Sequence, residues 1–325
     1  MKTTIAMVGP TGVGKTSLLA AMYNEFQPIV IESGCTFFCE GGTKKALTDR
    51  SNELKALASG KKMKIANDVG ILGSQEKREY DFTLGVPVEK RTVDVQLQFV
   101  DMPGGWYSGG GDYKTARDIL ANSDVTFWCI DAVALMEEQG EYHEQINEPR
   151  SIFDCYQNAA STLPDDHWIQ FVLIRAESYL RGDRKRDELF DRFHKSYEQH
   201  FSQLKHLMHS RKKTLGGSVS AVQTVGNVLF HTFDVDENGK AKAVFRRDAS
   251  KGFSPSGCTY PIARALEKGL DRKLGELIVE YERQFLPVLV QRLLGYDITY
   301  DEIVAVYDVL IHITDVIEDE HHIDL

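Results

Sequence analysis

The chain has 325 residues, of which 42% are hydrophobic and 26% charged, with 9 prolines and 26 glycines. This composition is typical of a compact globular protein and excludes a disordered or fibrous one, and the length allows one enlarged domain or two modest ones. Because 38 basic residues face 48 acidic ones, the formal net charge is −10. Such a charge argues against stable binding to nucleic acid or to an anionic membrane through bulk positive charge.

The cysteine content and the apolar runs indicate where the protein resides. Five cysteines are few and odd in number, which fits a reducing compartment better than a disulfide framework. No run approaches the roughly 18 apolar residues of a membrane span, and the first apolar run is too short for a secretory signal. We therefore expect a cytoplasmic protein without a membrane span.

The first part of the chain combines short strands with helices. The patterns predict a strand (3–8), a helix (15–26), a strand-like patch (28–31), a helix (43–59) that ends at Gly60, and a hairpin of two alternating strands (80–88 and 93–100). The segment from 3 to 26 is thus a strand, a glycine-containing loop and a helix.

The second part continues the alternation. The patterns predict helices at 113–121, 147–161, 184–210 and 259–285, buried strands at 125–130, 168–174 and 218–222, and a hairpin of 225–235 with 240–245. Strands that alternate with helices of this length indicate an α/β fold. We expect a mixed, mostly parallel sheet flanked by helices.

One loop carries a phosphate-binding motif. Gly9–Thr16 matches G-x-x-x-x-G-K-[ST] in full, between a strand end and a helix start. Backbone N–H groups and the helix dipole form an anion site there, while Lys15 supplies a cation to the β- and γ-phosphates and the Thr16 hydroxyl is a Mg²⁺ ligand. The predicted contacts are Gly9, Thr11, Gly12, Val13, Gly14, Lys15, Thr16 and Ser17.

A second motif ends the hairpin. The β-prone run up to Val100 is followed by Asp101-Met-Pro-Gly104, which matches D-x-x-G. An aspartate at the carboxyl end of a strand beside the loop can hold Mg²⁺, and the N–H of Gly104 can reach the γ-phosphate. We therefore predict catalytic roles for Lys15, Asp101 and Gly104.

Together the two motifs resemble the P-loop GTPases of the Ras-like and translation-factor class (TRAFAC), whose later boxes are N/T-K-x-D and S-A-x. This resemblance implies a G domain that binds GTP or GDP with Mg²⁺ and hydrolyses GTP. Its base-reading positions correspond to Arg175 and Glu177 after one strand and to Ser220 and Ala221 in the next. Ile174 departs from the polar first position of the box.

Within that class the chain is most similar to the bacterial double-GTPase group, proposed for conflict and defence-type operons. The similarity covers about residues 1–270 and rests on an insert before the second strand and on the spacing from Gly73-Ser74 to Phe82. It implies Ser74 as the switch I ligand of Mg²⁺, with Ser59 as a competing choice. Gly105 and Trp106 stand where Ras-like members carry a water-orienting Gln, which implies slow hydrolysis or a residue supplied by a partner.

We expect a G domain over 1–285, with inserts at about 34–75 and 225–250, and an acidic helical extension over 286–325. Between Leu293 and Leu325 the chain has nine acidic residues and no Lys or Arg. A capping box at Thr299–Glu302 opens an amphipathic helix there. This helix either packs on its own domain or docks a basic partner protein, such as a second GTPase or an effector.

Two other functions stay open at this stage. One is an ATP-hydrolysing P-loop protein, and the other is a nucleotide-binding assembly module with little turnover. A motor-type ATPase is disfavoured because its second motif would normally end in Asp-Glu, whereas this chain has Asp101-Met-Pro-Gly104.

Overall fold

The structure is a computed structural model that describes residues 2–60, 64–66, 76–88, 91–107, 112–283, 300–318 and 322–325. Its main element is an eight-stranded sheet made of β1 (Lys2–Val8), β2 (Thr36–Cys39), β4 (Arg78–Val88), β5 (Arg91–Asp101), β6 (Val125–Asp131), β7 (Asp166–Ile174), β8 (Thr214–Ala221) and β11 (His322–Asp324). The spatial order is β11-β8-β7-β6-β1-β5-β4-β2. The strands from β8 to β5 run parallel, and the others are antiparallel to their neighbours. The expected mixed, mostly parallel sheet is confirmed.

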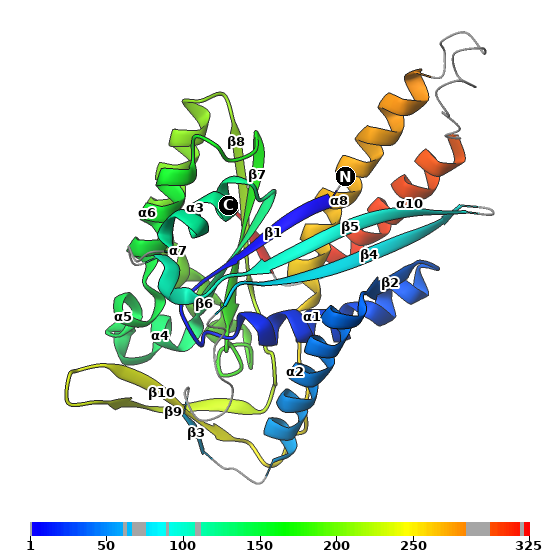
Figure 1. Ribbon diagram of the computed structural model, residues 1–325. Coiled ribbons are helices and arrows are strands. Elements are labelled where there is room, and N and C mark those ends of the chain that lie inside the picture. Colours follow the sequence, from blue (N-terminus) through cyan, green and yellow to red (C-terminus); the bar gives the residue numbers. More distant parts are fainter. Residues whose placement is uncertain are drawn as a thin grey trace.

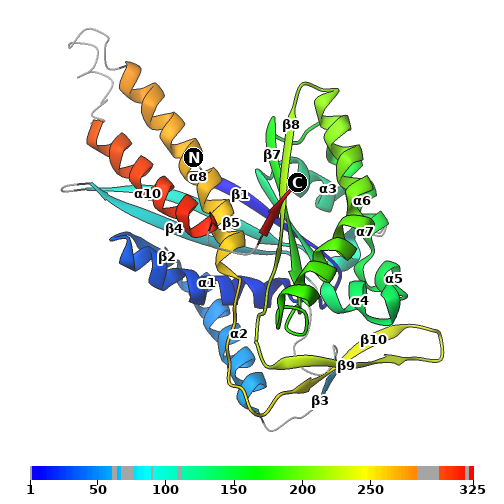
Figure 2. The same ribbon diagram turned by 180° about the vertical axis from the view of Figure 1, so that it is seen from behind.

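Helices cover both faces of this sheet (Figures 1 and 2). One side carries α1 (Lys15–Glu32), α8 (Thr259–Arg283) and α10 (Tyr300–Glu318), with α2 (Gly41–Ser59) packed on α1. The other side carries α3 (Tyr113–Ala121), α6 (Pro149–Ala159) and α7 (Asp183–His209). Since both faces are covered, every residue of β6 is buried, which explains why its sequence is mostly apolar.

A smaller sheet lies below the main one in Figure 1. It has the order β3-β10-β9, from β3 (Lys64–Ala66), β10 (Ala241–Arg247) and β9 (Val228–Val235). The turn of the predicted hairpin is confirmed: Gly239 has φ +76°, and the Asp236 carboxylate accepts from the N–H groups of Asn238 and Lys240. The sheet therefore joins the predicted hairpin insert to the segment before β4.

Two predicted elements are wrong in extent. The patch at 28–31 is not a strand, because α1 continues through Pro28 to Glu32; buried Phe26 and Val30, one turn apart, keep this stretch packed and outweigh the lost hydrogen bond of the proline. The strand predicted from Ser218 starts already at Thr214. Gly216 and Gly217 interrupt the β-prone pattern, so the first half of this strand was not predicted.

Those two glycines are required by neighbouring aromatic rings. A Cβ on Gly216 would come within 2.4 Å of the Trp168 ring, and one on Gly217 within 2.7 Å of Phe201. Glycine is uncommon in strands, so the sequence pattern did not predict one here. In this strand the two glycines let the aromatic rings lie directly on the backbone.

The C-terminal segments pack on the rest of the fold. Helix α10 lies against α8 and β4, and β11 pairs antiparallel with β8, from His322↔Ser220 to Asp324↔Ser218. The predicted acidic helix is thus found, while β2, β3 and β11 were not predicted. The described part of the chain also has the short segments α4 (Ala132–Met136), η2 (Glu137–Gly140), α5 (His143–Asn147) and η1 (Gly104–Tyr107). The domain boundary at 285/286 stays a prediction.

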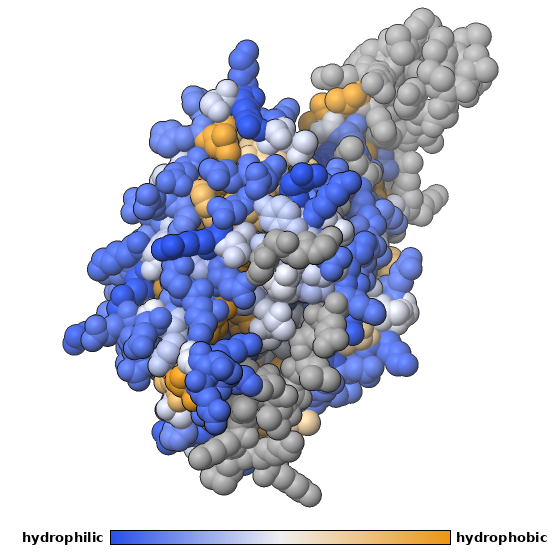
Figure 3. Space-filling model, turned by 60° about the vertical axis from the view of Figure 1, so that its left-hand side comes forward, coloured by the Kyte–Doolittle hydropathy of each residue, from blue (hydrophilic) through white to orange (hydrophobic). Residues whose placement is uncertain are grey.

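The surface is mostly polar. On the face drawn in Figure 3, hydrophilic residues dominate and the hydrophobic areas are small and separate. Among the helices in the described part of the chain, none is long and apolar enough to cross a membrane.

Candidate functional site

The loop after β1 has the backbone that its motif requires. Gly9, Gly12 and Gly14 all have positive φ, at +145°, +77° and +112°, a region in which glycine is not strained. A Cβ on Gly9 would stand 2.6 Å from the carbonyl oxygen of Cys129 in β6. The loop therefore packs closely on the sheet, and α1 begins directly after it at Lys15.

Lys15 lies inside this loop. Its ammonium group donates to the carbonyl oxygens of Gly9, at 2.9 Å, and Pro10, at 3.3 Å. Burial lowers the pKa of Lys15, while the nearby charge of Asp101 acts in the opposite direction. A buried cation at a helix N-terminus is a site where an anion gains both charge and hydrogen bonds.

Thr16 and Asp101 meet beside the lysine. Strand β5 lies next to β1, with Met7 paired to Asp101, so the last residue of β5 reaches the start of α1. The Thr16 hydroxyl donates to Oδ2 of Asp101 at 2.6 Å, and both side chains are buried. Hydroxyl and carboxylate oxygens are the donors that Mg²⁺ prefers, so this pair fits the metal that the sequence implies.

The turn after Asp101 packs on the phosphate loop. A Cβ on Gly104 would stand 2.1 Å from the backbone nitrogen of Thr11 and 2.4 Å from the carbonyl carbon of Pro10. Only glycine fits this contact without displacement. In contrast, a Cβ on Gly105 would meet no atom within 4 Å. The structure thus brings the two sequence motifs into direct contact.

Of the remaining loop residues, Val13 and Ser17 are both buried. The N–H of Val13 donates to the Pro10 carbonyl at 3.4 Å. Ile174, the departure from the expected polar residue, lies against the loop as well, since its Cγ2 atom would be 3.4 Å from a Cβ on Gly14. An apolar contact thus occupies this position.

Arg175 connects the loop to the end of β7. Its guanidinium donates to the Gly12 carbonyl oxygen at 2.5 Å and to Oδ2 of Asp131 at 2.5 Å. Arg175 itself has φ +64°, a conformation that costs a non-glycine residue free energy and is found where surrounding contacts impose it. The structure therefore places this predicted base-side residue against the phosphate loop.

Sequence reasoning missed Asp131. Its Oδ1 accepts from the N–H groups of Val133 and Ala134, at 3.0 and 3.3 Å, and its backbone N–H donates to Oδ1 of Asn147 at 2.7 Å. The carboxylate thus caps α4 and pairs with Arg175 at once. One feature of the sequence could have indicated this residue: Asp131 is acidic and stands at the carboxyl end of a strand that is predicted to be buried.

Glu177 is 3% exposed and lies against the chain after β8. Its Oε1 accepts from the N–H groups of Val225 and Gly226 at 3.4 and 3.5 Å. Burial raises the pKa of Glu177, partly offset by these N–H groups and by Arg175. In this structure the carboxylate therefore holds the loop that follows β8.

Ser220 and Ala221 are the last two residues of β8. Oγ of Ser220 accepts from the side-chain amide of Gln170 at 3.2 Å, and Ala221 pairs with Leu173. Both lie within the sheet, and it is the loop beyond them that contacts Glu177.

The predicted switch I ligand, Ser74, lies outside the described residues. Its competitor Ser59 is at the end of α2, where its hydroxyl donates to the Lys55 carbonyl at 2.7 Å. The Ser59 hydroxyl is therefore hydrogen-bonded within its own helix.

Comparison with known proteins decides the family. The model of a family described as Double-GTPase 2 matches residues 3–228, more than half of the chain. The chain belongs to the Double-GTPase 2 family. The predicted resemblance to P-loop GTPases of the double-GTPase group is thereby confirmed, and the matched range contains the phosphate loop, Asp101, Arg175 and Glu177.

Other comparisons add less. Among solved structures, one match is the signal recognition particle receptor SRb-GTP/SRX complex from Chaetomium thermophilum, with 15% sequence identity and a TM-score of 0.37. The alignment covers 69% of this chain and 92% of that chain. The comparison with curated proteins gives no match.

Proposed function

We propose that this member of the Double-GTPase 2 family is a Mg²⁺-dependent guanine-nucleotide switch that hydrolyses GTP to GDP and phosphate. The observation that carries the proposal is the meeting of Lys15, Thr16, Asp101 and Gly104 at one loop. Backbone N–H groups of the loop and the Lys15 ammonium would bind the β- and γ-phosphates. The ammonium would exchange its two neutral carbonyl acceptors for negatively charged phosphate oxygens, which are stronger acceptors.

Thr16 and Asp101 are the residues that would hold Mg²⁺, and Ser74 is our proposal for the switch I ligand. When bound, the metal neutralises charge on the phosphates. The close Thr16–Asp101 pair supports this assignment, because two oxygen donors already converge there. The buried carboxylate of Asp101 also orients the Thr16 hydroxyl.

Gly104 supports a switch mechanism. Its backbone touches Pro10 and Thr11 of the phosphate loop, so a γ-phosphate beside this contact would move the turn or draw its N–H toward the anion. GDP lacks that phosphate and leaves the turn free. The two nucleotides would therefore select different positions of the segment after β5.

For the base we propose guanine, read by Arg175, Glu177, Ser220 and Ala221. An ionised Glu177 would accept from the two N–H donors of guanine, which adenine does not offer in that arrangement. In this structure the Oε1 contacts to Val225 and Gly226 are long, at 3.4 and 3.5 Å, and such contacts exchange readily for better donors.

Hydrolysis is proposed to be slow without a partner. Gly105 and Trp106 occupy the positions after D-x-x-G, and Gly105 has no side chain to orient the attacking water. A residue supplied in trans would raise the rate, as the general mechanism of such enzymes allows. The lack of a water-orienting Gln after D-x-x-G would equally fit the alternative, an assembly module that binds nucleotide with little turnover.

The partner proposed is a basic protein, a second GTPase or an effector, in a bacterial operon-encoded cytoplasmic system. Helix α10 exposes Val304, Tyr307 and Ile311, one side of the helix, and Asp308 lies beside them. This stripe is apolar and acidic, so it complements an amphipathic segment with basic flanks. The five free, buried cysteines support a reducing compartment.

Competition between nucleotides tests the proposal. A fluorescent GDP analogue is bound to the full-length protein and displaced with GTP, GDP or ATP in the presence of Mg²⁺. We expect GTP and GDP to compete at least about tenfold better than ATP, since the Glu177 carboxylate would accept from the two N–H donors of guanine and adenine does not offer this pair. Equal or stronger competition by ATP would remove the guanine assignment and leave an ATPase.

Single-turnover release of phosphate separates a switch from an assembly module. The protein is loaded with GTP and measured alone and with its neighbouring gene products. Slow release that a partner accelerates supports the switch, whereas no release in either condition supports the module.

A further inference from the structure

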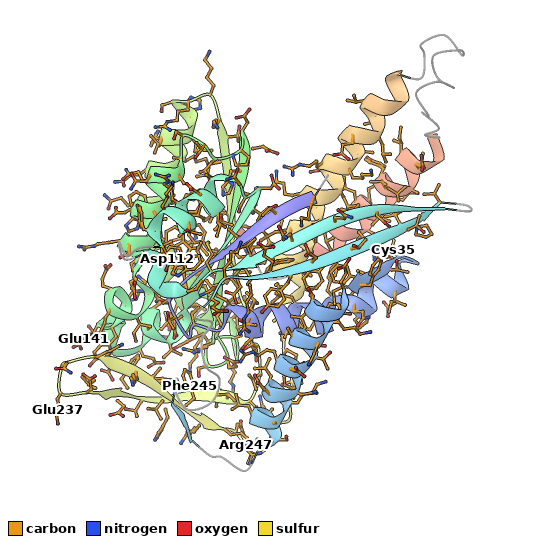
Figure 4. The ribbon with its side chains drawn as sticks, in the orientation of Figure 1. Cys35, Asp112, Glu141, Glu237, Phe245 and Arg247 are labelled. Carbon is orange, nitrogen blue, oxygen red and sulfur yellow. The ribbon has the colours of Figure 1, made fainter. Side chains whose placement is uncertain are left out.

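One contact outside the family's motifs reaches the proposed nucleotide site. The guanidinium carbon of Arg175 lies 5.1 Å from the ring centre of Phe245 in β10. Figure 4 labels Phe245 on the hairpin, whose tip at Glu237 extends away from it. A cation over an aromatic face at this distance is attracted by the ring.

Arg175 is fixed by three partners of different kinds. It donates to the Gly12 carbonyl and to the Asp131 carboxylate, and its charge faces the Phe245 ring. Its side chain is 18% exposed, and its φ of +64° is a strained conformation for arginine. Removing one partner would let both the side chain and the backbone relax.

The neighbouring strands fix the backbone of Phe245 on both sides, and the Phe230 ring lies 6.3 Å from its ring, centre to centre. Phe245 pairs with Phe230 of β9 and with Ile65 of β3. Between β9 and β10 the register shifts at this point, because Val244 pairs with Thr232 while Phe245 pairs with Phe230. The extra residue, His231, forms a bulge, and bulges redirect neighbouring side chains.

A second contact anchors the same hairpin elsewhere. Phe233 packs on Tyr142, with 4.7 Å between ring centres. The side-chain amide of Gln145 in α5 donates a hydrogen bond to the Gly239 carbonyl and accepts one from the N–H of Ala241. The attachment of the hairpin to the body therefore does not depend on Phe245 alone. This offers a matched control.

Resting on the proposed nucleotide-binding function, we propose that Phe245 is a positioning residue of the site. Its ring holds the Arg175 guanidinium against the Gly12 carbonyl and so keeps the phosphate loop and the base-side residue in one arrangement before nucleotide binds. The hairpin insert thereby contributes to nucleotide affinity without touching the phosphates. Preorganisation of this kind lowers the free-energy cost of binding.

The test measures the dissociation constant of a fluorescent GDP analogue on full-length variants. Phe245→Leu keeps an apolar side chain but removes the aromatic face, so we expect about tenfold weaker binding. Phe245→Tyr keeps the ring and should bind within about twofold of the original protein. Phe233→Leu disturbs the other anchor and should also stay within about twofold, because it leaves the contact to Arg175 intact.

A double-mutant cycle excludes a purely structural effect. In the Arg175→Met background, Phe245→Leu should cause no further loss of affinity, since its partner is already gone. Melting temperatures report the fold of every variant. Additive losses, unchanged affinity in Phe245→Leu, or failure of Phe245→Tyr to restore binding would overturn the proposal.

Two further results have definite meanings. Tighter binding by Phe245→Leu would also overturn the proposal and would identify the ring as an obstruction of the site. If the unmodified protein binds neither GDP nor GTP, the proposed function fails; if it binds both and the Phe245 variants match it, only the present inference fails.

Discussion

The two sides of the candidate site are built in different ways. On the phosphate side, backbone groups of three glycines in left-handed conformations and the buried Lys15, Thr16 and Asp101 converge on one loop. On the base side, Arg175 and Glu177 are engaged with the protein itself, through Asp131 and the loop after β8. On the proposed phosphate side the backbone of the loop is already in place and the Lys15 ammonium would change partners. On the proposed base side the carboxylate of Glu177 would have to leave its backbone partners to accept a ligand.

This contrast teaches how recognition is divided. Phosphate binding depends on local backbone geometry, which a contiguous motif can specify. Base recognition depends on side chains from separate loops, whose relative positions follow from packing between distant segments. Mutations on the two sides should therefore differ in size and in kind.

The largest effect is expected on the phosphate side. Lys15→Ala removes the buried cation, and we expect GDP and GTP affinity to fall about 100-fold or more, since charge-assisted bonds to phosphate are strong. Titration with a fluorescent nucleotide measures this. The exposed Lys185→Ala on α7 is the control and should bind normally. Unchanged affinity in Lys15→Ala would contradict the proposed phosphate site.

The next effect should separate binding from hydrolysis. Gly104→Ala places a Cβ 2.1 Å from the Thr11 nitrogen, so the turn must move off the loop. We expect GDP binding within about threefold of normal but GTP hydrolysis reduced about 30-fold or more. Gly105→Ala meets no atom within 4 Å and should retain both properties. Equal hydrolysis in the two variants would show that the turn does not act on the γ-phosphate.

On the base side we expect a smaller effect on nucleotide binding, together with a loss of stability. Asp131→Asn keeps the shape of the side chain but leaves the mostly buried Arg175 without its counter-charge. We expect a loss of about 3 kcal/mol in the free energy of unfolding, typical of breaking a buried ion pair, with weaker nucleotide binding. Denaturant unfolding measures it. Asp118→Asn, in an exposed pair with Arg117, should leave stability unchanged.

The smallest effect is a pH dependence. Burial raises the pKa of Glu177 above its ordinary value of 4.5, so the folded protein binds this proton more tightly than the unfolded chain does. The resulting stability is complete below pH 4.5 and is lost as the pH rises through the folded-state pKa. Glu177→Gln should remove this loss, which melting curves across pH would detect. The exposed Glu188→Gln should behave like the unmodified protein, and parallel curves for all three would contradict the assignment.

The sequence specifies local features of the fold well. The strand, glycine loop and helix around Lys15 depend on neighbouring residues, and helix 113–121 was predicted with its observed bounds. The family assignment followed from motifs of this contiguous kind. Asp101 was predicted to lie beside the loop for the same reason, because it ends a strand with an alternating pattern.

Features that depend on distant partners were missed. Strands β3 and β11 have three residues each, too few for periodicity, and exist through pairing with β10 and β8. Asp131 carries no motif, and only its contact with Arg175, 44 positions away, indicates its role. The contact of Phe245 with Arg175 joins residues 70 positions apart, one of them in the hairpin insert, and no local pattern encodes it.

The outer strands of the main sheet have a consequence for solubility. The sheet ends at β2, with four residues, and β11, with three, each paired to a longer strand. An edge strand offers unpaired backbone groups to other chains, and a short one offers few. Strand β2 pairs with Phe82–Gly85 of β4, and β11 pairs with Ser218–Ser220 of β8. These parts of the two longer strands are therefore closed to pairing with another chain.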